Sequence, residues 1–117
     1  MKPKKTILVV DDDEGMRDTL SAILKNDYEV RVAATGEEGL RVLKTADINL
    51  MLLDVLKIVR ESYSLIEVIM VSAMSEVEVA VQAMKDGADH YITKEFDCDG
   101  LRSLVRNALQ RQDLIGR

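Results

Sequence analysis

Acidic side chains follow two apolar segments of this sequence. The triplet Asp11–Asp13 comes directly after Ile7–Val10, and Asp54 comes directly after Leu50–Leu53. Short apolar runs of this kind are typical of buried parallel strands, and ligands bind at the carboxyl ends of such strands. We therefore expect these carboxylates to meet in space. Because crowded carboxylates repel one another, the pattern predicts a pocket in which some of these carboxyl groups ionise poorly or a cation binds among them.

A metal-assisted acidic pocket is the first hypothesis for this site. Hard oxygen ligands suit Mg²⁺, which keeps several waters, takes one or two carboxylates directly and can bridge a phosphoryl group. The ends of two later strands would bring the Ser72 hydroxyl and the Lys94 ammonium to the same crevice. Each is common as a turn residue or a solvated side chain. Chance rarely places acids, a hydroxyl and a cation at four strand ends, however.

Other chemistries lack their motifs. A nucleotide or flavin site would place glycines or hydroxyls after the first strand, where three aspartates stand. The sequence contains no Gly-x-Gly-x-x-Gly, P-loop or Gly-x-Ser-x-Gly pattern. The only histidine, His90, is expected to be an exposed residue at a strand end rather than a catalyst.

Composition limits the partners and the compartment. The 117 residues, 47% of them hydrophobic, suffice for one buried core. A net charge of −5 offers no positive field to nucleic acid or to an anionic membrane. The single cysteine, Cys98, excludes an internal disulfide framework. The first apolar stretch ends at Asp11, too early for an export signal or a membrane span, so we expect a cytoplasmic protein.

Segments with strand patterns and helix patterns alternate along the chain. The predicted strands are residues 6–10, 28–33, 48–54, 66–72 and 91–93. Because right-handed crossovers leave few other closures, this order predicts the α/β class: an open, doubly wound, five-stranded parallel sheet with helices on both faces. We expect one domain over residues 1–112, followed at 113–117 by a C-terminal tail or the start of a linker.

Capping signals precede the predicted helices. Asp13 and Asp97 are suited to cap the first and the last helix. Thr35–Glu38 and Ser75–Glu78 have the spacing of capping boxes, and Gly87 ends the helix after the second box. Two helices carry apolar side chains at helical spacing. These are Met16, Leu20, Ile23 and Leu24 in the first, and Leu101, Leu104, Val105 and Ala108 in the last.

Four segments at the ends of predicted strands match a known family. They are Ile7–Asp13, Leu52–Asp54, Val71–Ala73 and Gly87–Lys94. With these motifs in this order, nearly the whole chain resembles the receiver domain of bacterial two-component response regulators. The resemblance implies a flavodoxin-like (βα)5 fold with strand order 2-1-3-4-5.

By this resemblance, Asp54 is the phosphoacceptor. Its carboxylate would take a phosphoryl group from a phosphohistidine on a sensor histidine kinase or a phosphotransfer protein, giving an aspartyl phosphate. Asp11, Asp12 and Asp54 would hold Mg²⁺, the implied cofactor. The domain would be a signalling switch rather than an enzyme, with at most self-phosphorylation from small donors and slow autodephosphorylation.

The resemblance also implies how the switch works. Lys94 would pair with one phosphoryl oxygen and Ser72 would hydrogen-bond another. Tyr91 would follow the Ser72 hydroxyl inward and change the surface formed by the family's fourth helix, fifth strand and fifth helix. Residues 80–88 are most similar to receivers that precede ATPase-type transcription activators. This similarity implies a C-terminal output domain beyond this chain, and the family implies a dimer that forms on phosphorylation.

One departure from the family pattern is Glu95. Family members usually have a proline after the lysine of the fifth strand, in a cis peptide bond that helps to aim the lysine. A non-proline cis bond costs about 2.5–4 kcal/mol, so we expect the bond between Lys94 and Glu95 to be trans. Glu95 also adds a negative charge beside Lys94.

A second departure is the short crossover between Asp54 and Ser72. Only residues 55–65 remain for a loop, a helix and a loop, which is barely the length that a parallel crossover needs. In the family, a backbone carbonyl shortly after the phosphoacceptor also binds the metal. Because of the short crossover, that carbonyl is not assigned to a residue of this sequence. Either the protein lacks a segment, or the sequence omits a loop of the molecule. We favour an omission, because loops at active sites are often disordered.

Two alternative functions stay open. A degenerate receiver would be an interaction module that takes no phosphoryl group, as Glu95 and the short crossover suggest. A metal-dependent phosphohydrolase would use the Asp11–Asp13 cluster and would place its nucleophile after the first strand.

Overall fold

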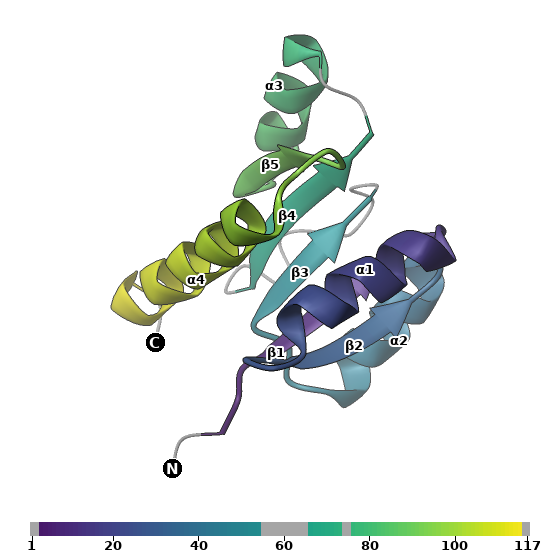
Figure 1. Cartoon of the computed structure of the whole chain (residues 1–117), viewed down its shortest axis with the longest axis vertical. Helices are drawn as coiled ribbons and strands as arrows, with labels where there is room; N and C mark the ends of the chain where they lie inside the picture. The colour runs from purple at the N-terminus through teal and green to yellow at the C-terminus, as the bar shows by residue number, and fades with distance from the viewer. Residues whose placement is uncertain (1–2, 55–65, 74–75, 116–117) are drawn as a thin grey trace.

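The computed structural model describes residues 3–54, 66–73 and 76–115, in which strands and helices alternate (Figure 1). The strands are β1 (Thr6–Val10), β2 (Glu29–Ala33), β3 (Leu50–Leu53), β4 (Glu67–Ser72) and β5 (His90–Thr93). The helices are α1 (Glu14–Leu24), α2 (Gly36–Thr45), α3 (Val77–Lys85) and α4 (Cys98–Ile115). Every predicted strand is present, with ends within a residue or two of those expected.

The strands form one parallel sheet in the order β2-β1-β3-β4-β5, which confirms the predicted architecture. At the end of β1, Val10 pairs with Ala33 of β2 on one side and with Leu53 of β3 on the other. The next residues along the chain, Asp11 and Asp54, therefore stand side by side. They lie where the parallel strands end, at what we call the carboxyl edge of the sheet.

Helices cover both faces of the sheet. α1 and α4 lie on one face and join the core that contains Ile7 and Val9, whereas α2 and α3 join the core on the other face, which contains Leu8 and Val10. Alternate side chains of β1 thus enter two different cores, and all four are buried. Each such burial contributes about 1.5–3 kcal/mol, which holds the strand ends in register. The apolar stripes predicted for the first and last helices all join the first of these cores.

Three capping residues act as predicted. The side chains of Asp13, Thr35 and Asp97 accept hydrogen bonds from N–H groups in the first turns of α1, α2 and α4. The return half of the second cap differs from a capping box, because the Glu38 carboxylate accepts from the N–H of Ala34 (3.2 Å). These caps start three helices at the carboxyl edge, next to the acids.

The predicted start of α3 is wrong. The N-cap is Glu76, one residue later than the expected Ser75, and Glu76 makes no side-chain capping hydrogen bond. Ser75 itself lies outside the described residues. The other end agrees with the prediction, since α3 stops at Lys85 and Gly87 has a positive φ of 111°. Only glycine adopts that conformation without strain, which explains the helix end.

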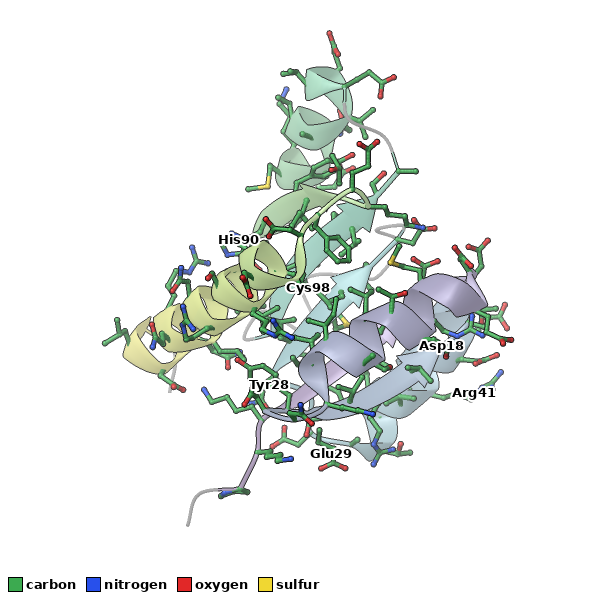
Figure 2. The ribbon with its side chains drawn as sticks, viewed as in Figure 1. Asp18, Tyr28, Glu29, Arg41, His90 and Cys98 are labelled. Atoms are coloured by element: carbon green, nitrogen blue, oxygen red, sulfur yellow. The ribbon has the colours of Figure 1, made fainter. Side chains whose placement is uncertain are left out.

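The structure describes three residues that the sequence singled out: Glu95, His90 and Cys98. The described residues contain no cis peptide bond, which confirms the trans bond before Glu95. His90 begins β5 as expected (Figure 2), but it is half-buried rather than exposed. Its Nε2 lies 3.7 Å from Oε1 of the buried Glu67. Cys98 is exposed at the first residue of α4.

Two expectations concern longer segments. The short crossover at 55–65 lies outside the described residues, so the structure tests neither explanation of its length. α4 extends to Ile115, beyond the expected domain boundary at residue 112. Within the described ranges, none of the helices is both long and apolar enough to cross a membrane.

Candidate functional site

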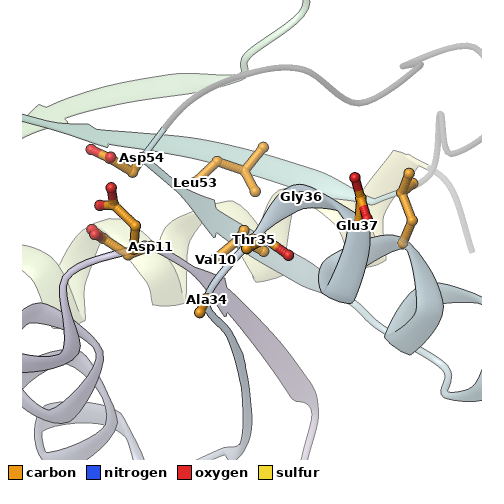
Figure 3. A pocket seen from close by; sticks show the side chains of 10 residues that line it. Val10, Asp11, Ala34, Thr35, Gly36, Glu37, Leu53 and Asp54 are labelled. Atoms are coloured by element: carbon orange, nitrogen blue, oxygen red, sulfur yellow. The ribbon is translucent and has the colours of Figure 1, made fainter.

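Three carboxylates meet at the carboxyl edge, as the strand pattern predicts. Asp11, Asp12 and Asp54 each offer one oxygen, and these oxygens lie within 4.8 Å of one another. Figure 3 shows the side chains of Asp11 and Asp54 facing each other beyond the ends of β1 and β3. Two unit charges at such a spacing repel by about 3–4 kcal/mol in a partly buried site. The cluster therefore needs compensating positive charge.

The three acids differ in their access to solvent. Asp11 is only 3% exposed, the Asp54 side chain is 25% exposed, and Asp12 is exposed. A reagent approaching from solvent can thus reach Asp54 and Asp12, whereas Asp11 forms the floor of the site.

Hydrogen bonds hold the backbone and the carboxylate of Asp11. Its N–H donates to the carbonyl of Ala33 (3.1 Å), and its Oδ1 accepts from the N–H of Asp13 (2.9 Å). Its own carbonyl accepts from Nη1 of Arg17 on α1 (2.9 Å). Sequence reasoning missed Arg17, because a single arginine in a helix carries no pattern that would distinguish it.

Lys94 supplies the compensating charge that these acids need. Its Nζ lies 3.1 Å from Oδ2 of Asp11 and 3.1 Å from Oδ1 of Asp54. Burial lowers the pKa of Lys94, but hydrogen bonds and charge attraction from the two carboxylates outweigh it and raise the pKa above 10.5. The side chain therefore stays an ammonium. Its position shows that a trans bond before Glu95 still lets Lys94 reach the acids.

Ser72 and Tyr91 lie on the neighbouring strands. Ser72 ends β4, is 9% exposed, and accepts the N–H of Lys94 at its carbonyl (2.8 Å). It thus stands at the same edge as the acids. Tyr91 pairs with Met70 and is half-buried against the core beneath α2 and α3. The structure therefore places Tyr91 in that core and outside the acid cluster.

A cavity of about 430 Å³ opens beside the acids. Its far wall is the start of α2, including Thr35, Gly36 and Leu40 (Figure 3). α2 lies close to β1 at Gly39, where an added Cβ would lie 3.0 Å from Cγ2 of Val10 and that side chain would have to shift. Sequence reasoning missed this wall. The Thr35 cap is the signal that could have found it, since a helix that follows a parallel strand starts at the carboxyl edge.

Comparison with known protein families identifies the family of this chain. The model of the response regulator receiver domain matches residues 7–106, which include all three acids, Ser72 and Lys94. The chain belongs to this family. As a receiver domain, it is a module of two-component signalling and not an enzyme in the ordinary sense.

Curated relatives of this receiver domain are longer proteins. A putative NtrX-like response regulator of Rickettsia bellii is 32% identical over 89% of this chain and 24% of its own length. The regulatory protein AtoC of Escherichia coli is 34% identical over 92% of this chain and 26% of its own length. The receiver domain thus spans about a quarter of each of these two regulators.

Solved structures have the same fold as this receiver domain. A CheY-like receiver domain protein from Methanospirillum hungatei superposes with a TM-score of 0.87 at 30% identity, covering 97% of this chain and 100% of that one. NtrX from Brucella abortus superposes with a TM-score of 0.87 at 28% identity, over 96% of this chain and 28% of that one. The flavodoxin-like fold implied by the sequence motifs is therefore shown.

Proposed function

We propose that this receiver domain is a phosphoacceptor switch. Asp54 takes a phosphoryl group from a phosphohistidine on a sensor histidine kinase or a phosphotransfer protein, and α3, β5 and α4 form the surface that signals the change. One observation carries this proposal: Lys94 bridges Asp11 and Asp54 in a cluster whose three carboxylates lie within 4.8 Å of one another. Family membership supports it.

The residues present fit Mg²⁺ as the cofactor. The cluster offers only carboxylate oxygens, which are hard ligands, and it carries three negative charges against the single ammonium of Lys94. Asp11, Asp12 and Asp54 would hold the ion. When bound, Mg²⁺ would supply positive charge for the oxygens of the phosphoryl group.

Asp54 is suited to be the nucleophile because its carboxylate is partly open to solvent, whereas Asp11 is buried. A carboxylate oxygen of Asp54 attacks the phosphorus, and an aspartyl phosphate forms as the phosphorus–nitrogen bond breaks. The electron pair of that bond leaves with the imidazole nitrogen. Lys94, already 3.1 Å from Oδ1 of Asp54, then pairs with an oxygen of the transferred group.

Two residues carry the signal away from the phosphoryl group. Ser72, at the end of β4, donates its hydroxyl hydrogen bond to a phosphoryl oxygen, and Tyr91 on β5 moves toward the place that the hydroxyl leaves. Tyr91 packs in the core beneath α3, so its movement changes the packing of that helix. The result is a population shift between two arrangements of the α3, β5 and α4 surface.

This mechanism implies partners and a place. Because NtrX-like and AtoC relatives are about four times as long as the matched region, we expect an output domain to read the surface. A dimer formed on phosphorylation would present it twice. We place the protein in the cytoplasm, where a phosphohistidine donor would meet it.

Phosphoryl transfer from a small donor tests the proposed function. The chain is incubated with Mg²⁺ and acetyl phosphate, and intact mass spectrometry follows the gain of one phosphoryl group, with Asp54→Asn as control. We expect the label on the wild type, its loss in Asp54→Asn, and its loss when Mg²⁺ is chelated. An unlabelled wild type would support a degenerate receiver, and steady hydrolysis of the donor by Asp54→Asn would support a phosphohydrolase.

A further inference from the structure

Asp12 is the one acid of the cluster whose side chain has no holding contact among the described residues. It is exposed, and neither a hydrogen bond nor an ion pair to its carboxylate is present in the described part of the chain. Its carboxylate oxygen nevertheless lies within 4.8 Å of those of Asp11 and Asp54. The backbone on either side of Asp12 must therefore aim this side chain.

Side chains hold both peptide units that flank Asp12. The carbonyl of Asp11, in the preceding unit, accepts from Nη1 of Arg17 (2.9 Å). The N–H of Asp13, in the following unit, donates to Oδ1 of Asp11 (2.9 Å). Because peptide units are planar, holding one atom of each restricts the two dihedral angles between them. Those angles set the direction of the Asp12 side chain.

We propose that Arg17 is a positioning residue for Asp12. By holding the carbonyl of Asp11 from α1, its guanidinium keeps the exposed carboxylate pointed into the cluster through the backbone. The inference rests on the proposed function in one respect, since Mg²⁺ is the ligand whose affinity should depend on this aim. It adds a residue of α1 to a site otherwise built from strand ends.

Charge and geometry make opposite predictions for the loss of Arg17. Removing its positive charge leaves the neighbourhood more acidic, so electrostatics alone would tighten the binding of a cation. Removing its hydrogen bond frees the peptide unit before Asp12, which would weaken binding. Partners that orient a metal ligand typically change metal affinity by about 10–100-fold, so geometry should prevail.

The test is Mg²⁺ titration calorimetry on the wild type, Arg17→Gln, Arg17→Lys and Arg41→Gln. Arg41→Gln is the matched control, because it makes the same charge change on the exposed surface of α2 (Figure 2). We expect about tenfold weaker binding in Arg17→Gln, partial recovery in Arg17→Lys, and the wild-type affinity in Arg41→Gln. Urea unfolding of each variant confirms that only folded protein is compared.

Amide exchange in the Mg²⁺-free protein gives a second readout. The N–H of Asp13, which donates to Oδ1 of Asp11, should exchange faster in Arg17→Gln, while those of the β1 core keep their wild-type rates. Unchanged or tighter Mg²⁺ binding by Arg17→Gln would overturn the inference, as would unchanged exchange at Asp13. A wild type that binds no Mg²⁺ would instead count against the proposed function, and the exchange data would still judge Arg17.

Discussion

Charged side chains are arranged differently at the two ends of the strands in this sheet. At the carboxyl edge, three carboxylates lie within 4.8 Å of one another, and two of them, Asp11 and Asp54, contact the ammonium of Lys94. At the opposite end, which we call the amino edge, Glu67 and Asp89 share Nη2 of Arg111 at 3.4 and 3.2 Å. Asp89 also accepts the N–H of Val68 (2.9 Å). Among the described residues, the carboxyl edge has three carboxylates and one ammonium, whereas the amino edge has two carboxylates that share one guanidinium and a backbone N–H.

The amino edge joins α4 to the sheet. Besides Arg111, the side chain of Gln112 donates to the carbonyl of Asn49 just before β3 (2.8 Å). The Asn49 side chain in turn accepts the N–H of Thr6 at the start of β1 (2.9 Å). Each of these contacts links two elements, so the polar groups of the amino edge join the helix to the strands. Within the described part of the chain, the edge with the larger excess of carboxylates over cations is the one that we propose as functional.

The largest effect is expected from replacing the proposed phosphoacceptor, Asp54. Asp54→Asn should abolish phosphoryl incorporation from acetyl phosphate, because an amide is no nucleophile for phosphorus. Asp89→Asn, the matched change at the amino edge, should label at the wild-type rate. Intact mass spectrometry measures both. Label retained on Asp54→Asn, or lost from Asp89→Asn, would reverse the assignment of the two edges.

Loss of Lys94 should have the next largest effect. Lys94→Met leaves the buried carboxylate of Asp11 without its cation, which should cost about 1–3 kcal/mol of unfolding free energy in Mg²⁺-free buffer. Millimolar Mg²⁺ should restore part of that loss, because the ion binds only the folded state. Urea denaturation with and without Mg²⁺ gives both values. A variant as stable as the wild type would show that the acids need no compensation.

A smaller effect is expected at the amino edge. Arg111→Met removes a side chain that is 50% exposed, so the loss should be only about 0.5–1 kcal/mol. Mg²⁺ should not restore it, and phosphoryl incorporation should be unchanged. The same urea experiments measure this variant. Rescue by Mg²⁺ here would mean that the cation acts on the whole molecule rather than on the carboxyl edge.

The smallest expected effect is a dependence on alkaline pH. A raised pKa means that the folded state holds the proton of Lys94 more tightly than the unfolded chain does. Its stabilising contribution is therefore complete below about pH 10.5 and is lost as the pH rises through the folded pKa. Burial also raises the pKa of Tyr28, which changes stability in the same direction. The difference between wild type and Lys94→Met in Mg²⁺-free urea titrations isolates Lys94, and a constant difference across alkaline pH would contradict this assignment.

Local patterns predicted much of the fold. The apolar runs at β1 and β3, the caps at Asp13, Thr35 and Asp97, and the stop at Gly87 are short-range signals that depend on a few neighbouring residues. The N-cap of α3 lies one residue later than predicted, at Glu76, whose side chain makes no capping hydrogen bond. A short capping pattern does not fix a helix boundary to a single residue.

Local patterns along the chain suffice to place the acids, Ser72 and Lys94 at strand ends and to identify the receiver family. Three other features emerge only in the folded molecule: Val10 pairs with Leu53, Lys94 reaches two carboxylates past a trans bond, and Arg17 holds the carbonyl of Asp11. Hydrophobic periodicity is a local property, readable from adjacent residues. Strand order, burial and the direction of a long side chain depend on the simultaneous packing of both faces of the sheet, which no short stretch of sequence contains.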